Sequence, residues 1–171
     1  MAGVNAEISL KITAQQIGSA DLGSPRMTLT PIEELLQFIS GTDAVNKLDL
    51  MFSDQRTVAA SSNEDIDLAG SLSDAFGSTI TAAEVVAIFI KAASGNTNNV
   101  NVTRPASNGF AGPFLAAGDG ISVKPGEYAL LVSQSGWAVT AGTGDLLNIA
   151  NSSSGTGVTY DIVVLARTVA A

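Results

Sequence analysis

Apolar and polar residues alternate in short runs along most of the chain. In Ala6–Thr13, the apolar residues Ile8, Leu10 and Ile12 alternate with polar ones. This period of two predicts a half-buried β-strand, because successive side chains of a strand point to opposite faces. Glu84–Ala92 is apolar at nearly every position, which predicts a central strand that is buried on both faces.

Similar runs predict strands through most of the remaining chain. Short connections rich in Gly, Asn, Asp, Ser or Pro separate them, and these residues favour turns. Short strands at regular spacing predict an all-β fold, an antiparallel β-sandwich of jelly-roll type, and no helix–strand alternation supports a parallel α/β sheet. The predicted strands include Arg26–Thr30, Lys47–Phe52, Arg56–Ala60, Ile66–Leu68, Asn99–Thr103, Phe110–Leu115, Gly120–Val123, Tyr128–Ser133, Gly136–Thr140, Asp145–Asn151 and Val158–Arg167, the last inside a sheet.

One segment, Pro31–Ile39, carries the signals of a short helix. Thr30 suits the N-cap, proline suits the first helical position, two glutamates follow in the first turn, and Gly41 would end the helix. The alternative for the same segment is a strand over Leu35–Ile39. The fold class therefore includes at most one short helix.

The first part of the chain is less regular than the rest. We expect residues 1–45 to form an extended N-terminal arm with an irregular segment, and residues 46–171 to form the β-sandwich domain. An extended arm can add a strand to the sheet edge of a neighbouring subunit, which strengthens assembly.

Charge and targeting signals narrow the function classes. The net charge is −8 and no two of the eight basic residues are adjacent, so the basic stripe of a nucleic-acid binder is missing. The N-terminus lacks the basic and apolar regions of a signal peptide, and the longest apolar run, Val85–Ile90, is too short to span a bilayer. We therefore expect synthesis and folding in a cytoplasm, without membrane or nucleic-acid partners.

The sequence has neither His nor Cys. This excludes Ser-His-Asp and Cys-His nucleophile systems and His- or Cys-based zinc sites, so we predict a non-enzymatic protein without a cofactor. A hydrolase with two carboxylates, drawn from Asp119, Glu127, Asp145 and Asp161, is the remaining enzymatic alternative. The acidic segment Glu64–Asp67 has oxygen ligands that suit Ca²⁺, although a solvated turn is the favoured interpretation.

Glycine-rich and aromatic positions complete the candidates. Gly142–Asp145 and Gly155–Gly157 lead into strands and not into helices, so we expect hairpin turns there and no phosphate loops. Trp137 suits stacking on a sugar, anchoring of an interface, or capping of the core. The candidate interface residues are Ile8, Leu10, Ile12, Phe110, Phe114 and Trp137.

Eight short motifs follow one another in a fixed order between Phe52 and Val164. They span about two-thirds of the chain and end with a Gly-rich turn, a strand, a Ser/Gly hairpin and a closing strand. The motifs are Phe52–Thr57, Glu64–Gly70, Asp74–Gly77, Gly95–Val100, Ala106–Phe110, Lys124–Gly126, Gly142–Ser152 and Val158–Val163. In this order they resemble tailed-bacteriophage virion structural proteins of the head decoration, or cement, type.

The resemblance implies a specific role. A protein of this type is a small β-sandwich that binds and stabilises the shell of the major capsid protein, and it is expected to be a homotrimer at the capsid surface. Such a role needs no catalytic site and no cofactor. The alternative is a tail or fibre-base structural protein that binds a glycan or receptor through Trp137 and the loop at Phe110.

Overall fold

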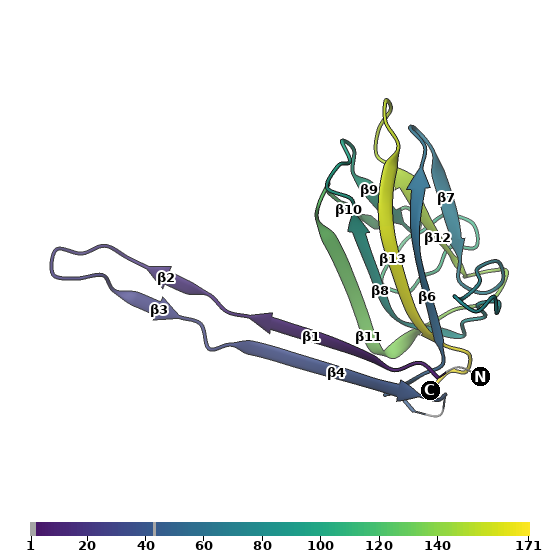
Figure 1. Ribbon diagram of the computed structural model, residues 1–171, viewed down its shortest axis with the longest axis horizontal. Coiled ribbons are helices and arrows are strands. Elements are labelled where there is room, and N and C mark those ends of the chain that lie inside the picture. The colour runs from purple at the N-terminus through teal and green to yellow at the C-terminus, as the bar shows by residue number, and fades with distance from the viewer. Residues whose placement is uncertain (1–2, 43) are drawn as a thin grey trace.

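The computed structural model describes residues 3–42 and 44–171, and every regular element among them is a β-strand (Figure 1). The all-β class predicted from the sequence is confirmed. The strands are β1 (Ala6–Ile12), β2 (Gln15–Ile17), β3 (Arg26–Thr28), β4 (Ile32–Ser40), β5 (Lys47–Leu48), β6 (Leu50–Val58), β7 (Asn63–Asp67), β8 (Glu84–Ala92), β9 (Val100–Thr103), β10 (Gly120–Val123), β11 (Tyr128–Ala138), β12 (Leu146–Asn151) and β13 (Val158–Arg167).

The strands from β6 onward form a sandwich of two four-stranded antiparallel sheets. One sheet has the order β11-β8-β13-β6, and we call it the arm-side sheet; the far sheet has the order β10-β9-β12-β7. Strands that are neighbours in sequence mostly lie in different sheets, and eight strands wound in this way make a jelly roll. As the sequence predicted, β8 and β13 lie inside their sheet.

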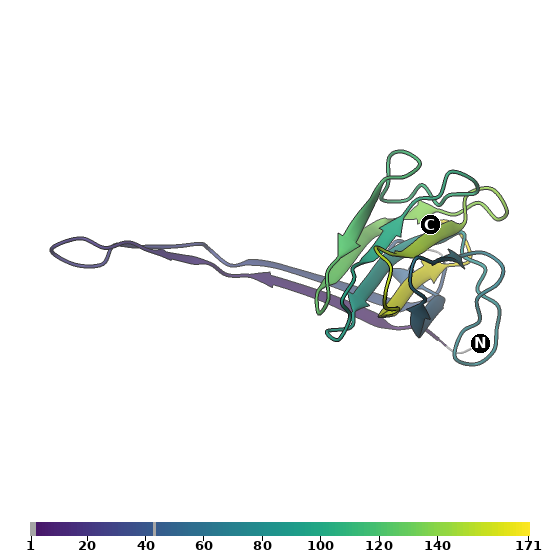
Figure 2. The same ribbon diagram turned by 90° about the horizontal axis from the view of Figure 1, so that it is seen from above.

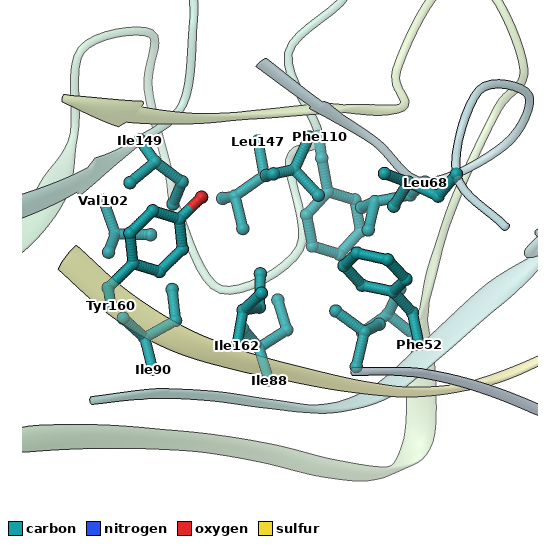
Figure 3. Packing of buried hydrophobic residues seen from close by; sticks show 14 of the residues in the cluster. Phe52, Leu68, Ile88, Ile90, Val102, Phe110, Leu147, Ile149, Tyr160 and Ile162 are labelled. Carbon is teal, nitrogen blue, oxygen red and sulfur yellow. The ribbon is translucent and has the colours of Figure 1, made fainter. Parts of the chain in front are cut away.

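The main core fills the space between the two sheets (Figure 3). Alternate residues of each strand point inward, as the period-two pattern requires. Figure 3 shows Tyr160, Ile162 and Ile88 of the arm-side sheet facing Leu147 and Ile149 of the far sheet, and all five are buried. Burial of this many large apolar side chains gives the sandwich a core of its own.

The N-terminal strands form a long two-stranded arm that projects from the sandwich (Figures 1 and 2). β1 pairs with β4 over the full length of β1, and β2 pairs with β3 further out. A tight turn between Ala20 and Gly23 closes the tip. The arm is therefore a ribbon within one chain, and its strands use each other as partners.

The predicted helix over Pro31–Ile39 is wrong, and the strand alternative is closer to the structure. Leu36 and Phe38 share one face of β4 and pack against the sandwich, whereas a helix would turn them apart. β1 supplies a pairing partner for β4 from Ile32 to Phe38, and β5 pairs with its last two residues. A helix of one or two turns has no comparable packing to stabilise it, so the strand is favoured.

A second, smaller core fixes the base of the arm to the outer face of the arm-side sheet. Phe38 of the arm and Leu48 of β5 are buried there against Val86, Ala87 and Leu165. β5 pairs in parallel with the end of β4 and so continues the arm into the sandwich. The arm therefore leaves the sandwich from a packed junction.

A buried ion pair lies at the same junction. Arg167 is fully buried; its Nη2 and Nε atoms donate to Oε2 of Glu84 at 2.7 and 3.0 Å. Its Nη1 also donates to the carbonyl oxygens of Val45 and Gln134, at 3.1 and 3.4 Å. One guanidinium thus joins β13, β8, the segment after the arm, and β11. A Cβ on Gly136, whose φ is +83°, would lie 2.7 Å from Nη2, so the irregular stretch of β11 needs glycine there.

Candidate protein-binding surface

One face of the arm is apolar along the paired length of β1 and β4, with Glu34 as its one charged residue. Pairing places Ile8 beside Leu36 and Ile12 beside Ile32. The opposite face carries mostly polar residues, such as Glu7. We call the apolar side the arm face; its residues are Ala6, Ile8, Leu10 and Ile12 of β1 and Ile32, Glu34, Leu36 and Phe38 of β4.

Burial decreases along the arm face from its base outward. Phe38 is only 2% exposed, and Leu36 is half-buried. Leu10 is 47% exposed, Ile12 45% and Ile32 47%. The arm face therefore runs past the edge of the sandwich, and its outer half is open to solvent.

The outward side of the arm-side sheet is also apolar, and we call it the sheet face. It is formed by alternate residues of its strands, because their neighbours point into the main core. Part of the sheet face is exposed: Tyr128 is 68% and Leu130 is 41% exposed. The ring of Tyr128 packs beside that of Phe89, with the two ring centroids 5.8 Å apart. The sheet face consists of Tyr128, Leu130, Val132, Ala87, Phe89, Val163, Leu165 and Met51.

The two faces meet in an apolar groove where the arm diverges from β11. The groove has a volume of about 540 Å³ and lies between the arm face and the outer side of β11. Its lining residues are Ile8, Ser9, Leu10, Glu34, Leu36, Tyr128, Leu130 and Val132. A smaller hollow of about 280 Å³ continues beneath β1 toward Phe89 and Val163. Groove and faces together form one continuous apolar surface.

The outer face of the far sheet has the opposite character. Nδ2 of Asn148 donates to Oδ1 of Asp65 at 2.7 Å and to Oδ1 of Asn63 at 3.0 Å. Oγ of Ser122 donates to Oδ1 of Asn101 at 2.7 Å. These short polar side chains satisfy one another across the strands and suit a solvated surface. The apolar surface is therefore confined to the arm side of the molecule.

The six candidate interface residues lie in three different environments. Ile8, Leu10 and Ile12 all lie on the arm face, with Ile8 half-buried against the sandwich. Phe110 and Phe114 are 0% and 8% exposed and belong to the main core. Their assignment as interface residues is therefore corrected: both are core residues. Both belong to the loop between β9 and β10, which closes one end of the sandwich, and neither lies in a strand.

Trp137 is half-buried and packs against the main core. This placement fits the interpretation of Trp137 as a cap on the core. It lies on the irregular stretch of β11 where the pairing with β8 shifts register, between Val132 and Trp137.

Sequence reasoning missed the sheet-face half of the surface. Tyr128, Leu130 and Val132 alternate with core-facing Ala129 and Leu131, so β11 is apolar on both sides. In an edge strand of an antiparallel sheet, an apolar outward side is the signal of a covering partner. The sequence did not show that β11 is an edge strand, and the signal could not be interpreted without that knowledge.

The acidic segment Glu64–Asp67 forms strand β7 and not a turn. Its one inward carboxylate, Glu64, accepts hydrogen bonds from Arg56 Nε at 2.8 Å and from the Tyr160 hydroxyl at 2.9 Å. Within residues 3–42 and 44–171, no three carboxylates come close enough together to hold a metal ion. Glu64 instead ties the two sheets together, because Arg56 and Tyr160 belong to the arm-side sheet.

This cluster gives the protein a pH dependence in the alkaline range. Burial, and next the hydrogen bond to Glu64, raise the pKa of Tyr160 well above its ordinary value. The unfolded tyrosine ionises near pH 10 while the folded one stays neutral, so stability is complete below about pH 10 and decreases above it. We expect the free energy of unfolding in urea to fall more steeply from pH 9 to 11 in the wild type than in Tyr160→Phe. Equal slopes would contradict this role of Tyr160.

Three of the four carboxylates considered for a hydrolase accept hydrogen bonds within the fold. Asp119 accepts from the backbone N–H of Ala116 at 2.7 Å, and Asp161 accepts from Gln55 at 2.8 Å. Asp145 accepts from the N–H of Gly142 in the loop from β11 to β12.

The loop that contains Gly142–Asp145 and the loop that contains Gly155–Gly157 each connect strands of different sheets. The prediction of hairpins between paired strands is therefore corrected: both loops are crossovers between the sheets.

Comparisons with known proteins add no relative: no family model, no curated protein and no solved structure matches the chain. Among the described residues there is also no helix long and apolar enough to cross a membrane.

Proposed function

We propose that the chain is a structural protein of a bacteriophage virion, a decoration (cement) protein that binds and stabilises the shell of the major capsid protein. The observation that carries this proposal is the arm, a protruding ribbon with an exposed apolar face on a packed jelly roll. The ordered motif resemblance supplies the type of assembly. For a protein of this type, we propose a location at the capsid surface and assembly as a homotrimer.

The arm has the physical properties of a segment that acts by binding protein. An isolated two-stranded ribbon is marginally stable in water, because its apolar side has nothing to pack on. Apolar patches larger than a few hundred Å² are rare on monomeric soluble proteins and mark interaction sites. The exposed apolar residues of the arm face, with the groove of about 540 Å³ beside them, support such a role in binding protein.

The tip of the arm supports contact with a shell in particular. Leu22 lies in the tip turn and is 103% exposed, and Ile17 and Met27 nearby are 58% and 69% exposed. The strands from residue 6 to residue 20 reach roughly 50 Å at about 3.3 Å per residue. A ribbon of this length can extend from its own sandwich onto a neighbouring capsid subunit and place Leu22 in an apolar pocket there.

The test is binding to shells assembled from the major capsid protein of the same virus and lacking this chain. We expect the purified protein to sediment with these shells at saturable stoichiometry and to raise their resistance to heat. Leu22→Asp should weaken the binding at least tenfold, whereas Leu115→Asp, at an equally exposed position of the sandwich, should leave it unchanged. A wild-type protein that stays in the supernatant would overturn the proposal.

The tail or fibre-base role is the competing outcome of the same experiment. A protein that binds isolated tails but not shells would move the proposal to the tail. Selective binding on a glycan array that is abolished in Trp137→Ala would favour a receptor-binding role.

A further inference from the structure

The chain already shows how the arm face and the sheet face pack on each other. At the base of the arm, Ile8 and Leu36 lie against Ala87, Val163 and Leu165 of the sheet face. Two apolar β-surfaces stack here in the manner of sheets in a sandwich. The two faces are therefore complementary within one molecule, but only their inner halves are in contact.

The outer halves of both faces are left uncovered in a single copy. On the arm face these are Leu10, Ile12 and Ile32, with Glu34 among them beside Leu10; on the sheet face they are Tyr128 and Leu130. The arm diverges from β11 as it leaves the sandwich (Figures 1 and 2). A groove of about 540 Å³ lies between the arm and β11, so the two outer halves of a single copy cannot contact each other. Each molecule thus carries one unused arm face and one unused sheet face.

We infer that the arm of a second copy fills the groove, so that the outer arm face of one molecule packs on the sheet face of the next. The contact continues a packing that the chain itself already makes, with the same kinds of residue on both sides. It also covers the ribbon that is marginal alone. The inference goes beyond the shell-binding proposal, since it concerns the free protein.

The symmetry of the contact follows from its two unlike surfaces. A donor face that binds a different acceptor face makes a heterologous contact, which closes into a ring when the rotation permits. Every copy in a closed ring has both faces covered, and no apolar groove stays open. An isologous dimer of two arm faces would leave Tyr128 and Leu130 exposed on both copies.

The contact should become tighter as salt increases. Each copy carries a net charge of −8, so copies repel one another at low ionic strength. The proposed contact is mostly apolar, and its one charged residue, Glu34, is also negative. Raising the salt from 0.02 M to about 0.5 M shortens the screening length to a few ångström. We expect sedimentation velocity to show a larger oligomeric fraction at the higher salt. Dissociation on adding salt would show that ion pairs hold the contact.

The decisive test is cross-linking between singly substituted chains, which is clean because the natural sequence has no cysteine. Ile12→Cys and Tyr128→Cys proteins are mixed and treated with a short bis-maleimide. We expect cross-linked species in the mixture and only background in either protein alone. Lys11→Cys mixed with Tyr128→Cys is the matched control, since Lys11 lies on the opposite face of the same strand.

The other results would overturn the inference. Cross-linking of Ile12→Cys with itself alone would show an isologous arm contact. Equal cross-linking of Lys11→Cys and Ile12→Cys would show that the arm face has no preference. A monomer in sedimentation at high concentration, without cross-links, would show that the groove does not take a second copy. Binding to shells is measured in a separate experiment, so each of these results can be distinguished from a failure of the shell-binding proposal.

Discussion

Replacing Arg167 by Ala should lower the free energy of unfolding by about 3–5 kcal/mol, because it leaves the carboxylate of Glu84 without its buried partner. The Val45 and Gln134 carbonyl oxygens lose their donor in the same variant. For a chain of this size the loss corresponds to a fall in Tm of about 6–20 °C. Thermal unfolding followed by circular dichroism measures it.

Two further variants separate the ion pair from general damage. Arg167→Met combined with Glu84→Met removes both charges and should recover part of the lost stability, because no charge is left buried alone. Arg26→Ala, in the exposed strand β3, should change stability by no more than about 0.5 kcal/mol. If Arg167→Ala unfolds at the wild-type temperature, Arg167 does not hold the junction together.

Replacing both Leu10 and Ile12 by Asp should abolish self-association while the sandwich keeps its stability. Full burial of a Leu or Ile side chain contributes about 1.5–3 kcal/mol, and the contact can bury only the exposed half of each, so losing both weakens association by a factor of about 10 to 10². Each Asp adds the cost of placing a charge in a mostly apolar contact. The main core contains neither residue, and both are nearly half exposed in the single copy. Sedimentation equilibrium gives the association constant, and calorimetry gives the unfolding temperature.

The matched control uses the other face of the same ribbon. Leu35 and Gln37 lie on the side of β4 opposite the arm face, neither lines the groove, and Leu35 is 56% exposed. Replacing both by Asp adds the same charge to the same ribbon, and association should stay within a few fold of the wild type. Equal losses in the two double variants would mean that charge on the arm, and not its apolar face, controls association.

The sequence pattern was sufficient for the fold class because the apolar and polar positions of each strand indicate which of its faces are buried. Glu84–Ala92 is apolar at nearly every position, and it lies in the middle of a sheet between two strands. The pattern did not predict which strands pair with each other. The Gly142–Asp145 loop has the residues of a hairpin turn, yet it connects strands of different sheets. Local residues determine that the chain turns, while long-range packing determines which strand receives it.

The arm shows the same limit in the candidate site. Ile8, Leu10 and Ile12 were identifiable from their alternation, and they do form one face. Their partner on the sandwich was not identifiable, because Tyr128 and Leu130 become a surface only when β11 is an edge strand. Conversely, Phe110 looked like an exposed loop aromatic but closes the core, since loop position alone says nothing about burial.

The proposed decoration role gives the sandwich and the arm different tasks. The sandwich supplies a rigid body whose far-sheet face is polar and suits the solvent side. The arm side carries the apolar surface that needs partners, and the tip at Leu22 reaches furthest from the sandwich (Figure 1). We therefore expect the arm side to face the shell and the neighbouring copies.

Cryo-electron microscopy of the phage particle in which we propose to find this chain tests the proposed role most directly. The proposal expects jelly-roll density on the outside of the head, with each arm lying on a neighbouring copy and its tip on the major capsid protein. Density for the chain only in the tail, or a head surface without it, would contradict the proposal.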